Sequence, residues 1–290
     1  MLTSSHRFSF AGLFIGLLVG ALFAAGVAYH GSRTTSLLTR RAALLAEEND
    51  RLRSLVRDAE RSKALARSKV QRDAVEREVT AIRGLRFKSP VDYQILDRKQ
   101  IKETISGKLS EVFSEEEFTN ITAALARLGL LEPGYPLRKK YVDLLGEQVA
   151  AFYDQHQHKL FMFEDASLDN AQNRVVLAHE LTHALQDQHF GLQRLPLELK
   201  SNDDRVAAAA ALVEGEATLV MSEYTLKNLS LATLKDSLAS TFSQDMAQLA
   251  EAPAYLRETL IFPYLRGQEF CGALYGRGEY DAVSKAYSHP

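Results

Sequence analysis

Residues 175–188 read Val-Val-Leu-Ala-His-Glu-Leu-Thr-His-Ala-Leu-Gln-Asp-Gln, and the rest of the chain is best understood outward from this stretch. Four residues turn an α-helix by about 400°, so His179 and His183 lie one turn apart on one face, where both imidazoles can reach one cation. Glu180 lies about 100° further round, where a general base can take a proton from zinc-bound water. The apolar residues of the stretch bury its other faces. The pattern therefore predicts a buried metal-ligand helix.

The His-acid-x-x-His spacing rarely arises by chance. The chain has 8 His and 37 acidic residues among 290. These frequencies give an expected number of chance matches of roughly 0.03 for the whole chain. The alternative is an amphipathic helix with two solvated histidines. We favour a zinc site with His179 and His183 as ligands and Glu180 as the catalytic base.

The composition is that of a packed globular protein. Hydrophobic residues make up 46% and charged residues 25% of the chain, the net charge is −2, and the pI is about 6.5. This balance does not suggest a nucleic-acid partner. A single cysteine, Cys271, excludes an internal disulfide framework.

Residues 8–29 contain no charged side chain and are rich in Leu, Ala, Gly, Phe and Val. At about 1.5 Å per residue this run covers roughly 33 Å, enough for a bilayer core, and it predicts a single-pass membrane anchor over residues 1–30. The alternative is a cleaved signal peptide, with Gly26 and Ala28 near the cleavage site.

The orientation of this anchor is predicted less directly. Arg7 precedes the apolar run, whereas Arg33, Arg40 and Arg41 follow it, and the positive-inside rule alone would place the main domain in the cytoplasm. Large domains translocate despite such a bias, so we expect an extracytoplasmic catalytic domain.

Residues 31–84 predict a coiled-coil stalk. No Pro or Gly interrupts residues 38–82, and a heptad register places Leu38, Leu45 and Leu52 at d. Asn49 and Val56 then occupy a positions, a combination that favours a parallel homodimer. About 45 helical residues would hold the following domain roughly 65 Å from the membrane. The alternative is a single charged helix packed on that domain.

Gly84 and the Ser89-Pro90 pair mark the start of a domain over residues 85–290. Two apolar runs flank the polar Gln155-His156-Gln157-His158 connection and predict a β-hairpin, where both histidines are expected on the surface. Together with the metal-ligand helix, these elements predict an α+β class, with a small mixed sheet and several helices. The other helices are expected over residues 95–109, 114–128, 138–145 and 203–226.

A third ligand is needed, because catalytic zinc takes three protein ligands and leaves one position for water. Glu214 and Glu216 lie in an otherwise alanine-rich helix, where a buried acid is costly unless it is paired or binds a metal. They are about 200° apart on the helix, so only one can face the site. Position alone does not choose between them.

The motif His179-Glu180-x-x-His183, followed by Leu-Val-Glu-Gly-Glu-Ala over residues 212–217, resembles the gluzincin metallopeptidases. Residues 151–154 and 183–188 also resemble uncharacterised bacterial zincins. The resemblance implies a zincin-like domain that hydrolyses peptide bonds. It also implies that Glu214 is the third zinc ligand, because this residue precedes the glycine. The gap from His183 to Glu214 is 31 residues (214 − 183), longer than is usual in the thermolysin and aminopeptidase branches.

A further match is Pro263-Tyr264-Leu-Arg-Gly267, which resembles a segment of aminopeptidase-type gluzincins whose tyrosine binds the tetrahedral oxyanion. The resemblance implies this catalytic role for Tyr264; the alternative is a buried tyrosine at the start of a helix. Asp187 could orient a ligand imidazole or cap its own helix. No Gly-x-Met-Glu-Asn motif lies in residues 151–164, which favours an endopeptidase.

The sequence thus predicts a membrane-anchored zinc metallopeptidase acting on a peptide or protein substrate. The alternative is a non-catalytic, membrane-anchored coiled-coil scaffold with a degenerate zincin module. An intact Glu180 favours the enzyme, since a scaffold has no need of a general base.

Overall fold

The computed structural model describes residues 32–148, 151–163, 166–229 and 249–288. The predicted membrane anchor over residues 1–30 lies outside these ranges. Within them, no helix is both long enough and apolar enough to cross a membrane. The chain divides into two compact units, Met1–Arg67 and Ser68–Pro290.

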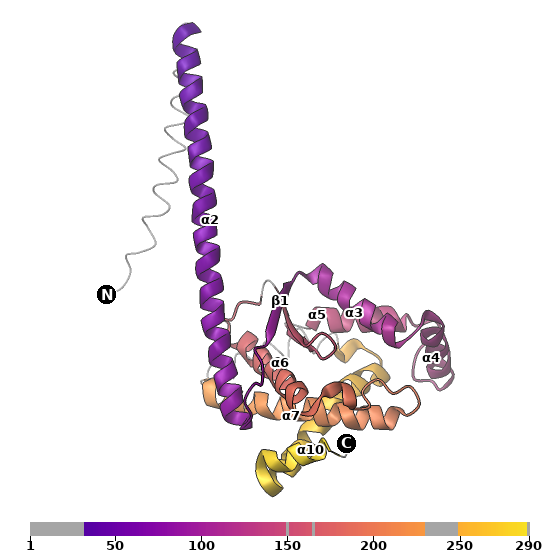
Figure 1. Ribbon diagram of the computed structural model, residues 1–290. Helices are drawn as coiled ribbons and strands as arrows, with labels where there is room; N and C mark the ends of the chain where they lie inside the picture. The colour runs from indigo at the N-terminus through magenta and orange to yellow at the C-terminus, as the bar shows by residue number, and fades with distance from the viewer. Residues whose placement is uncertain (1–31, 149–150, 164–165, 230–248, 289–290) are drawn as a thin grey trace. The chain divides into compact units, whose positions relative to one another are not determined.

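Helix α2, Ser32–Arg83, is continuous, as expected from the absence of Pro and Gly (Figure 1). In the first unit its apolar positions Leu45, Leu52 and Val56 are 62%, 52% and 56% exposed. Its last turns belong to the second unit, where Val75 and Val79 are buried. The second unit begins at Ser68, so the last turns of α2 lie in the same unit as the domain predicted over residues 85–290.

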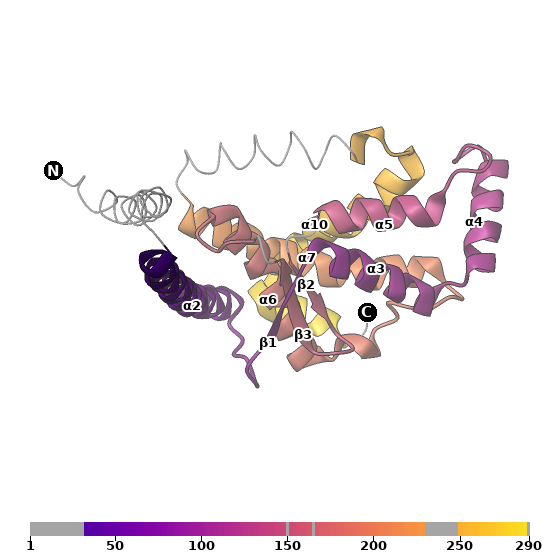
Figure 2. The same cartoon turned by 90° about the horizontal axis from the view of Figure 1, so that it is seen from above.

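The sheet has three strands in the order β1-β3-β2 (Figure 2). Strands β2, Ala151–Asp154, and β3, Lys159–Phe163, pair antiparallel, which confirms the predicted hairpin. The Asp154 carboxylate accepts the backbone N–H groups of His156 and Gln157 and so closes the turn. Strand β1, Asp92–Leu96, pairs parallel with β3.

The predicted helix over residues 95–109 begins later than expected. Ile95 and Leu96 belong to β1, and α3 runs over Arg98–Val112. Asp97 caps α3 by accepting the N–H of Gln100, whose side chain accepts the Asp97 N–H in return. The error arose because the strand that pairs with β1 is distant in sequence, so no local pattern shows it.

The other predicted helices form. Ser114 caps α4 through a reciprocal pair of hydrogen bonds with Glu117. Asn202 caps α7 by accepting the N–H of Arg205. The remaining elements are α4, Glu115–Arg127; α5, Leu137–Gln148; α6, Ala171–Phe190; the 3-10 turn η1, Leu192–Arg194; α7, Asp203–Asn228; and α10, Ala254–Ala286.

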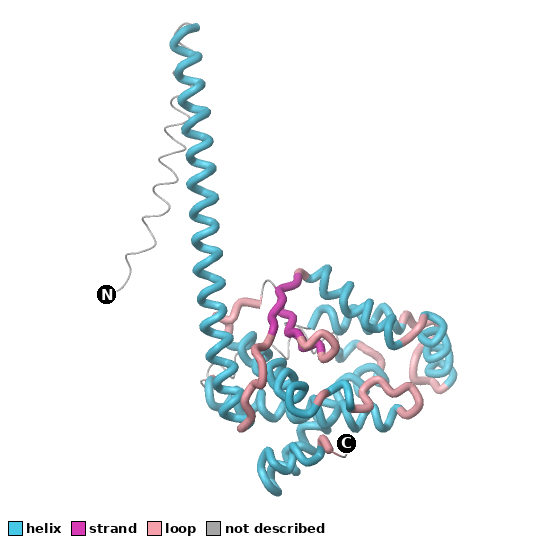
Figure 3. Tube along the Cα trace, viewed as in Figure 1, coloured by secondary structure: helices cyan, strands magenta, loops and turns pink. Residues whose placement is uncertain are grey.

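The predicted α+β class is wrong, because the described chain is mostly helical. Its strands form one small sheet, drawn in magenta in Figure 3. Long runs rich in Ala, Leu, Glu and Arg favour helices, whereas the strand-forming runs are only four or five residues long. The predicted transmembrane helix is not found among the described helices.

Helices α7 and α10 cross in backbone contact. A Cβ added to Gly215 would stand 2.1 Å from the Gly267 carbonyl carbon, and one added to Gly267 would stand 2.1 Å from the Ala211 carbonyl oxygen. Helix α10 begins at Ala254 and carries Pro263 in its interior, so Tyr264 lies within this helix and not at its start. Leu256, in the first turns of α10, is fully buried and packs in a separate cluster with residues of α4 and α5.

Candidate metal centre

Helix α6 carries the His-Glu-x-x-His motif through the main hydrophobic core. Asn170 caps its start by accepting the Gln172 N–H, and Gly191, with φ of 70°, ends it in a conformation that glycine adopts freely. Every residue from 177 to 187 is buried. Because α7 covers one side of α6 and the sheet another, both histidines project from a rigid support.

Three ligand atoms converge on one point. His179 Nε2 and His183 Nε2 are 3.0 Å apart, and Glu214 Oε2 lies 3.1 Å from the first and 3.3 Å from the second. Ligand atoms bound to a tetrahedral zinc ion at about 2.0–2.1 Å stand about 3.3 Å apart. The three atoms therefore form a triangle close in size to one face of a zinc coordination tetrahedron.

The two acids of α7 face different ways. Glu214 turns toward the imidazoles, with its side chain 24% exposed, whereas Glu216 is fully buried and has no exposed surface. Glu216 instead accepts hydrogen bonds from Arg83 and Tyr287. Of the two candidates for third ligand, the structure thus brings Glu214 to the histidines.

Glu180 completes the cluster. It offers an oxygen within 4.8 Å of ligand atoms of His179 and His183, and this buried group of three can hold a metal ion. Its Oε2 accepts the backbone N–H of Tyr153, in β2, at 2.8 Å. This bond fixes the carboxylate between the metal-ligand helix and the edge strand of the sheet.

The tautomer of His183 suits a metal ligand. Gln186 Nε2 donates to the Val213 carbonyl at 2.9 Å and to Glu216 at 2.8 Å, so Gln186 Oε1 must accept the Nδ1–H of His183, 2.8 Å away. The lone pair of His183 is then on Nε2, which faces Glu214. His179 Nδ1 is buried without a hydrogen-bond partner among the described residues.

Charge couples these groups. Burial opposes protonation of His183, but the negative charge of Glu214, a hydrogen bond to it and the Glu180 charge raise the pKa of His183 to about 9. Burial alone would raise the pKa of Glu214, yet the two imidazoles hold it well below its ordinary value. Burial raises the pKa of Glu180 even though both histidines act to lower it. The site thus concentrates negative charge on Glu214, beside the two imidazoles.

Tyr264, on α10, stands against this cluster. Its ring stacks on that of His179, with centroids 6.0 Å apart and planes inclined by 25°, and the residue is 43% exposed. The negative charges of Glu214 and Glu180 raise the pKa of Tyr264 well above 10.0. Its phenol therefore keeps its proton and can donate a hydrogen bond to an anionic oxygen.

Asp187 bonds to groups other than His179 and His183 among the described residues. It accepts the Leu192 N–H at 3.0 Å, which caps the end of α6, and the Tyr153 hydroxyl at 2.8 Å. His158 Nδ1 lies 2.6 Å from the same carboxylate, and His156 lies 2.7 Å from Glu198. Both histidines are exposed, as predicted, and pair with these acids away from the ligand set.

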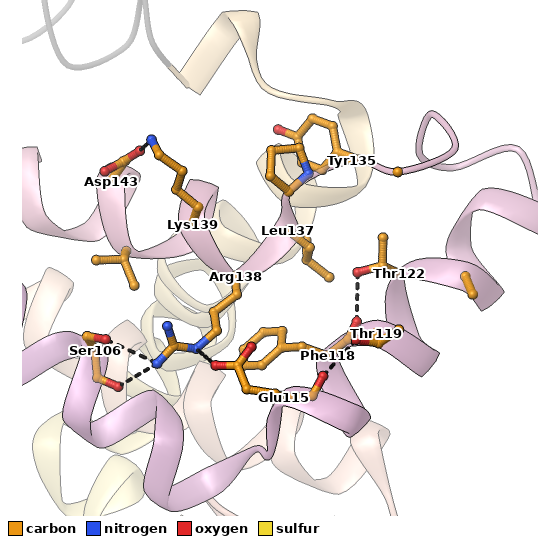
Figure 4. Close-up of a pocket in the computed structure, with 14 residues that line it drawn as sticks. Ser106, Glu115, Phe118, Thr119, Thr122, Tyr135, Leu137, Arg138, Lys139 and Asp143 are labelled. Atoms are coloured by element: carbon orange, nitrogen blue, oxygen red, sulfur yellow. Dashed lines mark hydrogen bonds and ion pairs between the residues drawn. The ribbon is translucent and has the colours of Figure 1, made fainter.

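A cavity of about 640 Å³ lies apart from this site, among α3, α4 and α5 (Figure 4). Its polar side chains are engaged with one another. Arg138 donates to the Ser106 hydroxyl and backbone carbonyl and pairs with Glu115, and Lys139 pairs with Asp143. None of the predicted site residues lines it, so its size does not make it the candidate site.

Comparisons of the chain with protein-family models, curated proteins and solved structures found no match.

Sequence reasoning missed three contributors to the site. Gln186 lies three residues after His183, on the same helix face, and this spacing could have identified it in place of Asp187. Tyr153 acts through its backbone N–H, which no side-chain pattern shows. Arg83 reaches Glu216 from α2 across 133 positions of sequence.

Proposed function

We propose that this protein is a zinc-dependent metallopeptidase that hydrolyses peptide bonds within a peptide or protein substrate. In this proposal His179, His183 and Glu214 bind zinc, Glu180 is the general base, and Tyr264 stabilises the oxyanion. The observation that carries it is the convergence of His179 Nε2, His183 Nε2 and Glu214 Oε2 beside a buried carboxylate. The gluzincin-like motifs support the same assignment.

Zinc in such a site supplies a Lewis acid that activates water and polarises a carbonyl oxygen. Glu180 takes the proton of the attacking water on its free carboxylate oxygen, because Oε2 is held by the Tyr153 N–H. The same carboxylate can then give this proton to the leaving amine. The Tyr264 hydroxyl donates a hydrogen bond to the oxygen on which negative charge develops.

The scaffold alternative explains less of this arrangement. Burying a carboxylate beside a second acid lowers the stability of the folded protein, so it is expected only where the carboxylate has a function. Glu180 is 8% exposed, and the charge of Glu214 adds to the cost of ionising it. A scaffold would be more stable with an apolar residue at this position.

The experiment uses the purified full-length chain, analysed for metal and incubated with a peptide library. We expect about one zinc per chain and endoproteolytic cleavage. Glu180→Gln keeps the size of the side chain but removes the base, so hydrolysis should fall by orders of magnitude while zinc is retained.

The matched control is Glu269→Gln, an exposed glutamate on α10, which should leave both readouts unchanged. A wild-type protein that binds zinc but cleaves nothing, with Glu180→Gln behaving identically, would support the scaffold in place of the enzyme.

A further inference from the structure

A buried polar chain extends from the metal centre to α2. Gln186, 1% exposed, receives the Nδ1–H of His183 and donates its own amide protons to Val213 and Glu216. Each atom of this amide therefore has a defined partner. If the Gln186 amide were rotated by half a turn, its NH2 group would face the Nδ1–H of His183, and its oxygen would face two acceptors. The network therefore permits only one orientation of this amide.

Glu216 is the centre of this chain. Its side chain has no exposed surface, and it receives the Arg83 Nε–H, the Tyr287 hydroxyl and the Gln186 amide. Arg83, 3% exposed, also donates to the Ser284 hydroxyl at 2.7 Å. Helices α2, α6, α7 and α10 thus all contribute to one satisfied network.

Such a network is not the most stabilising way to fill a core. Replacing a buried ion pair with apolar residues of similar volume is often neutral or favourable, so packing alone does not account for Arg83 and Glu216. The network ends, however, on the Nδ1–H of His183. A hydrogen bond at that atom fixes the ring plane of a metal-binding histidine and strengthens its other nitrogen as a ligand.

We propose that Gln186 and Glu216 are positioning residues that hold His183 with Nε2 toward the metal, and that Arg83 of α2 supplies the charge that keeps Glu216 in place. This inference rests on the proposed metal site and names its supporting residues. Under this proposal, the affinity for the metal depends on Arg83 of α2, a helix that carries no metal ligand. The last turn of α2 is thereby linked to the metal centre.

The first readout is spectroscopic and needs no metal. In the metal-free full-length chain with ¹⁵N-labelled histidine, the Nδ1–H of His183 should give a downfield signal protected from exchange with water. The bond to Gln186 accounts for this signal whether the ring is neutral or protonated. Gln186→Met has nearly the same length but accepts no such bond, so the signal should disappear.

The second readout is zinc affinity, measured by competition with a chelator. Gln186→Met should bind zinc about 10- to 100-fold more weakly than the wild type. The double variant Gln186→Glu with Glu216→Gln keeps one carboxylate in the network and an acceptor for His183, but the Val213 carbonyl loses its donor, so this variant should recover only part of the affinity. The matched control, Gln188→Leu, removes an amide on α6 that bonds to the backbone of residues 88 and 89, and should bind zinc normally.

The outcomes separate this inference from the proposed function. If the wild type binds zinc and Gln186→Met binds it equally well with an unchanged signal, the positioning role is wrong and the metal site stands. If the wild type binds no zinc, the proposed function fails, and the signal alone decides the hydrogen-bond role. Should Gln186→Met not fold, the double variant replaces it: a lost signal there would contradict the proposal.

Discussion

At the scale of single residues, two acids separated by one glycine have different environments. Glu214 faces two imidazoles, and Glu216, fully buried, is matched by Arg83 and Tyr287. The difference follows from the helical rotation of about 200° between them. A carboxylate on one face of α7 is thus available to a cation, while its neighbour is neutralised within the protein.

The role of Tyr264 can be isolated by removing one hydroxyl group. Tyr264→Phe keeps the ring stacked on His179 but deletes the donor, so kcat should fall about 10²-fold or more with little change in KM. Steady-state kinetics on a cleaved peptide measure both constants.

The control for this prediction is Tyr275→Phe, eleven residues along α10 and about 16 Å further along the helix axis. It should leave kcat unchanged. Equal kcat values for Tyr264→Phe and the wild type would contradict the proposal that the Tyr264 hydroxyl stabilises the oxyanion.

At the scale of elements, the crossing of α7 and α10 decides where Tyr264 lies. Gly215 follows Glu214 directly, and Gly267 is three residues after Tyr264. The contact between the two glycines therefore brings Glu214 and Tyr264, both candidate site residues, close together. The Glu-Gly and Tyr-x-x-Gly patterns therefore have a packing explanation. Each glycine permits the approach of a helix that carries a site residue.

Gly267→Ala should be strongly destabilising, because its Cβ would stand 2.1 Å from the Ala211 carbonyl oxygen and the helices must separate. We expect a loss of at least about 2 kcal/mol in the free energy of unfolding. Gly272→Ala, on the same helix with nothing within 4 Å, should instead stabilise by about 0.5–1 kcal/mol. Denaturant titrations compare the two, and equal stabilities would refute the close crossing.

The hairpin that supports Glu180 depends on one buried acid. Asp154 accepts two turn N–H groups and pairs with Lys108 at 2.7 Å. Burial acts to raise its pKa, but Lys108 and the two N–H groups outweigh burial and lower it. A folded-state pKa below the unfolded value stabilises the protein above the unfolded pKa, and this stabilisation is lost as pH falls through the folded pKa.

Asp154→Asn should therefore cost about 1–3 kcal/mol in unfolding free energy near neutral pH, with the difference narrowing below about pH 4. Urea titrations of both proteins from pH 7 to pH 3 give the measurement. Asp92→Asn, which breaks an exposed pair with Lys159, is the control and should have little effect. A pH-independent difference for Asp154→Asn would contradict the assignment.

At the scale of the whole molecule, the last turns of α2 belong to the compact unit Ser68–Pro290, which holds the candidate metal centre. Val75 and Val79 are 1% and 0% exposed, and Arg83 holds the buried Glu216. A fragment that begins at residue 84 would lose all three. Burial of each valine contributes about 1.5–3 kcal/mol, and an unpaired buried charge costs about 3–5 kcal/mol. The sum is comparable with the whole stability of a typical domain.

We therefore expect residues 68–290 to fold and residues 84–290 to fail. Thermal unfolding followed by circular dichroism distinguishes them, since only the longer fragment should give a cooperative transition. A cooperative transition for residues 84–290, with the same midpoint, would show that α2 is dispensable.

Pairing of the predicted stalk is a separate prediction. The exposed positions Leu45, Leu52 and Val56 lie in the heptad register that favours a parallel dimer. A peptide over residues 34–82 should sediment as a dimer, with helicity that rises with concentration. If the peptide is a monomer at high concentration, the parallel homodimer predicted from the heptad pattern is wrong.

The sequence by itself determined the features that depend on neighbouring residues. The spacing of His179 and His183, the helices predicted over residues 114–128 and 203–226, and the hairpin of β2 and β3 all rest on local geometry. Helical and strand periods fix which residues share a face. The motif on α6 could therefore be predicted with its helix. The mostly helical class could not be predicted, and the expected α+β class was wrong, since class depends on how much of the chain the tertiary context leaves in strands.

Only the tertiary structure decided which acid of α7 meets the histidines, because that choice depends on how α7 is rotated against α6. The same holds for β1, whose partner strand is distant in sequence, and for the Arg83–Glu216 pair, 133 positions apart. The physical reason is common to all three: a long-range contact is selected by shape and charge in the folded core, and no local sequence pattern encodes it.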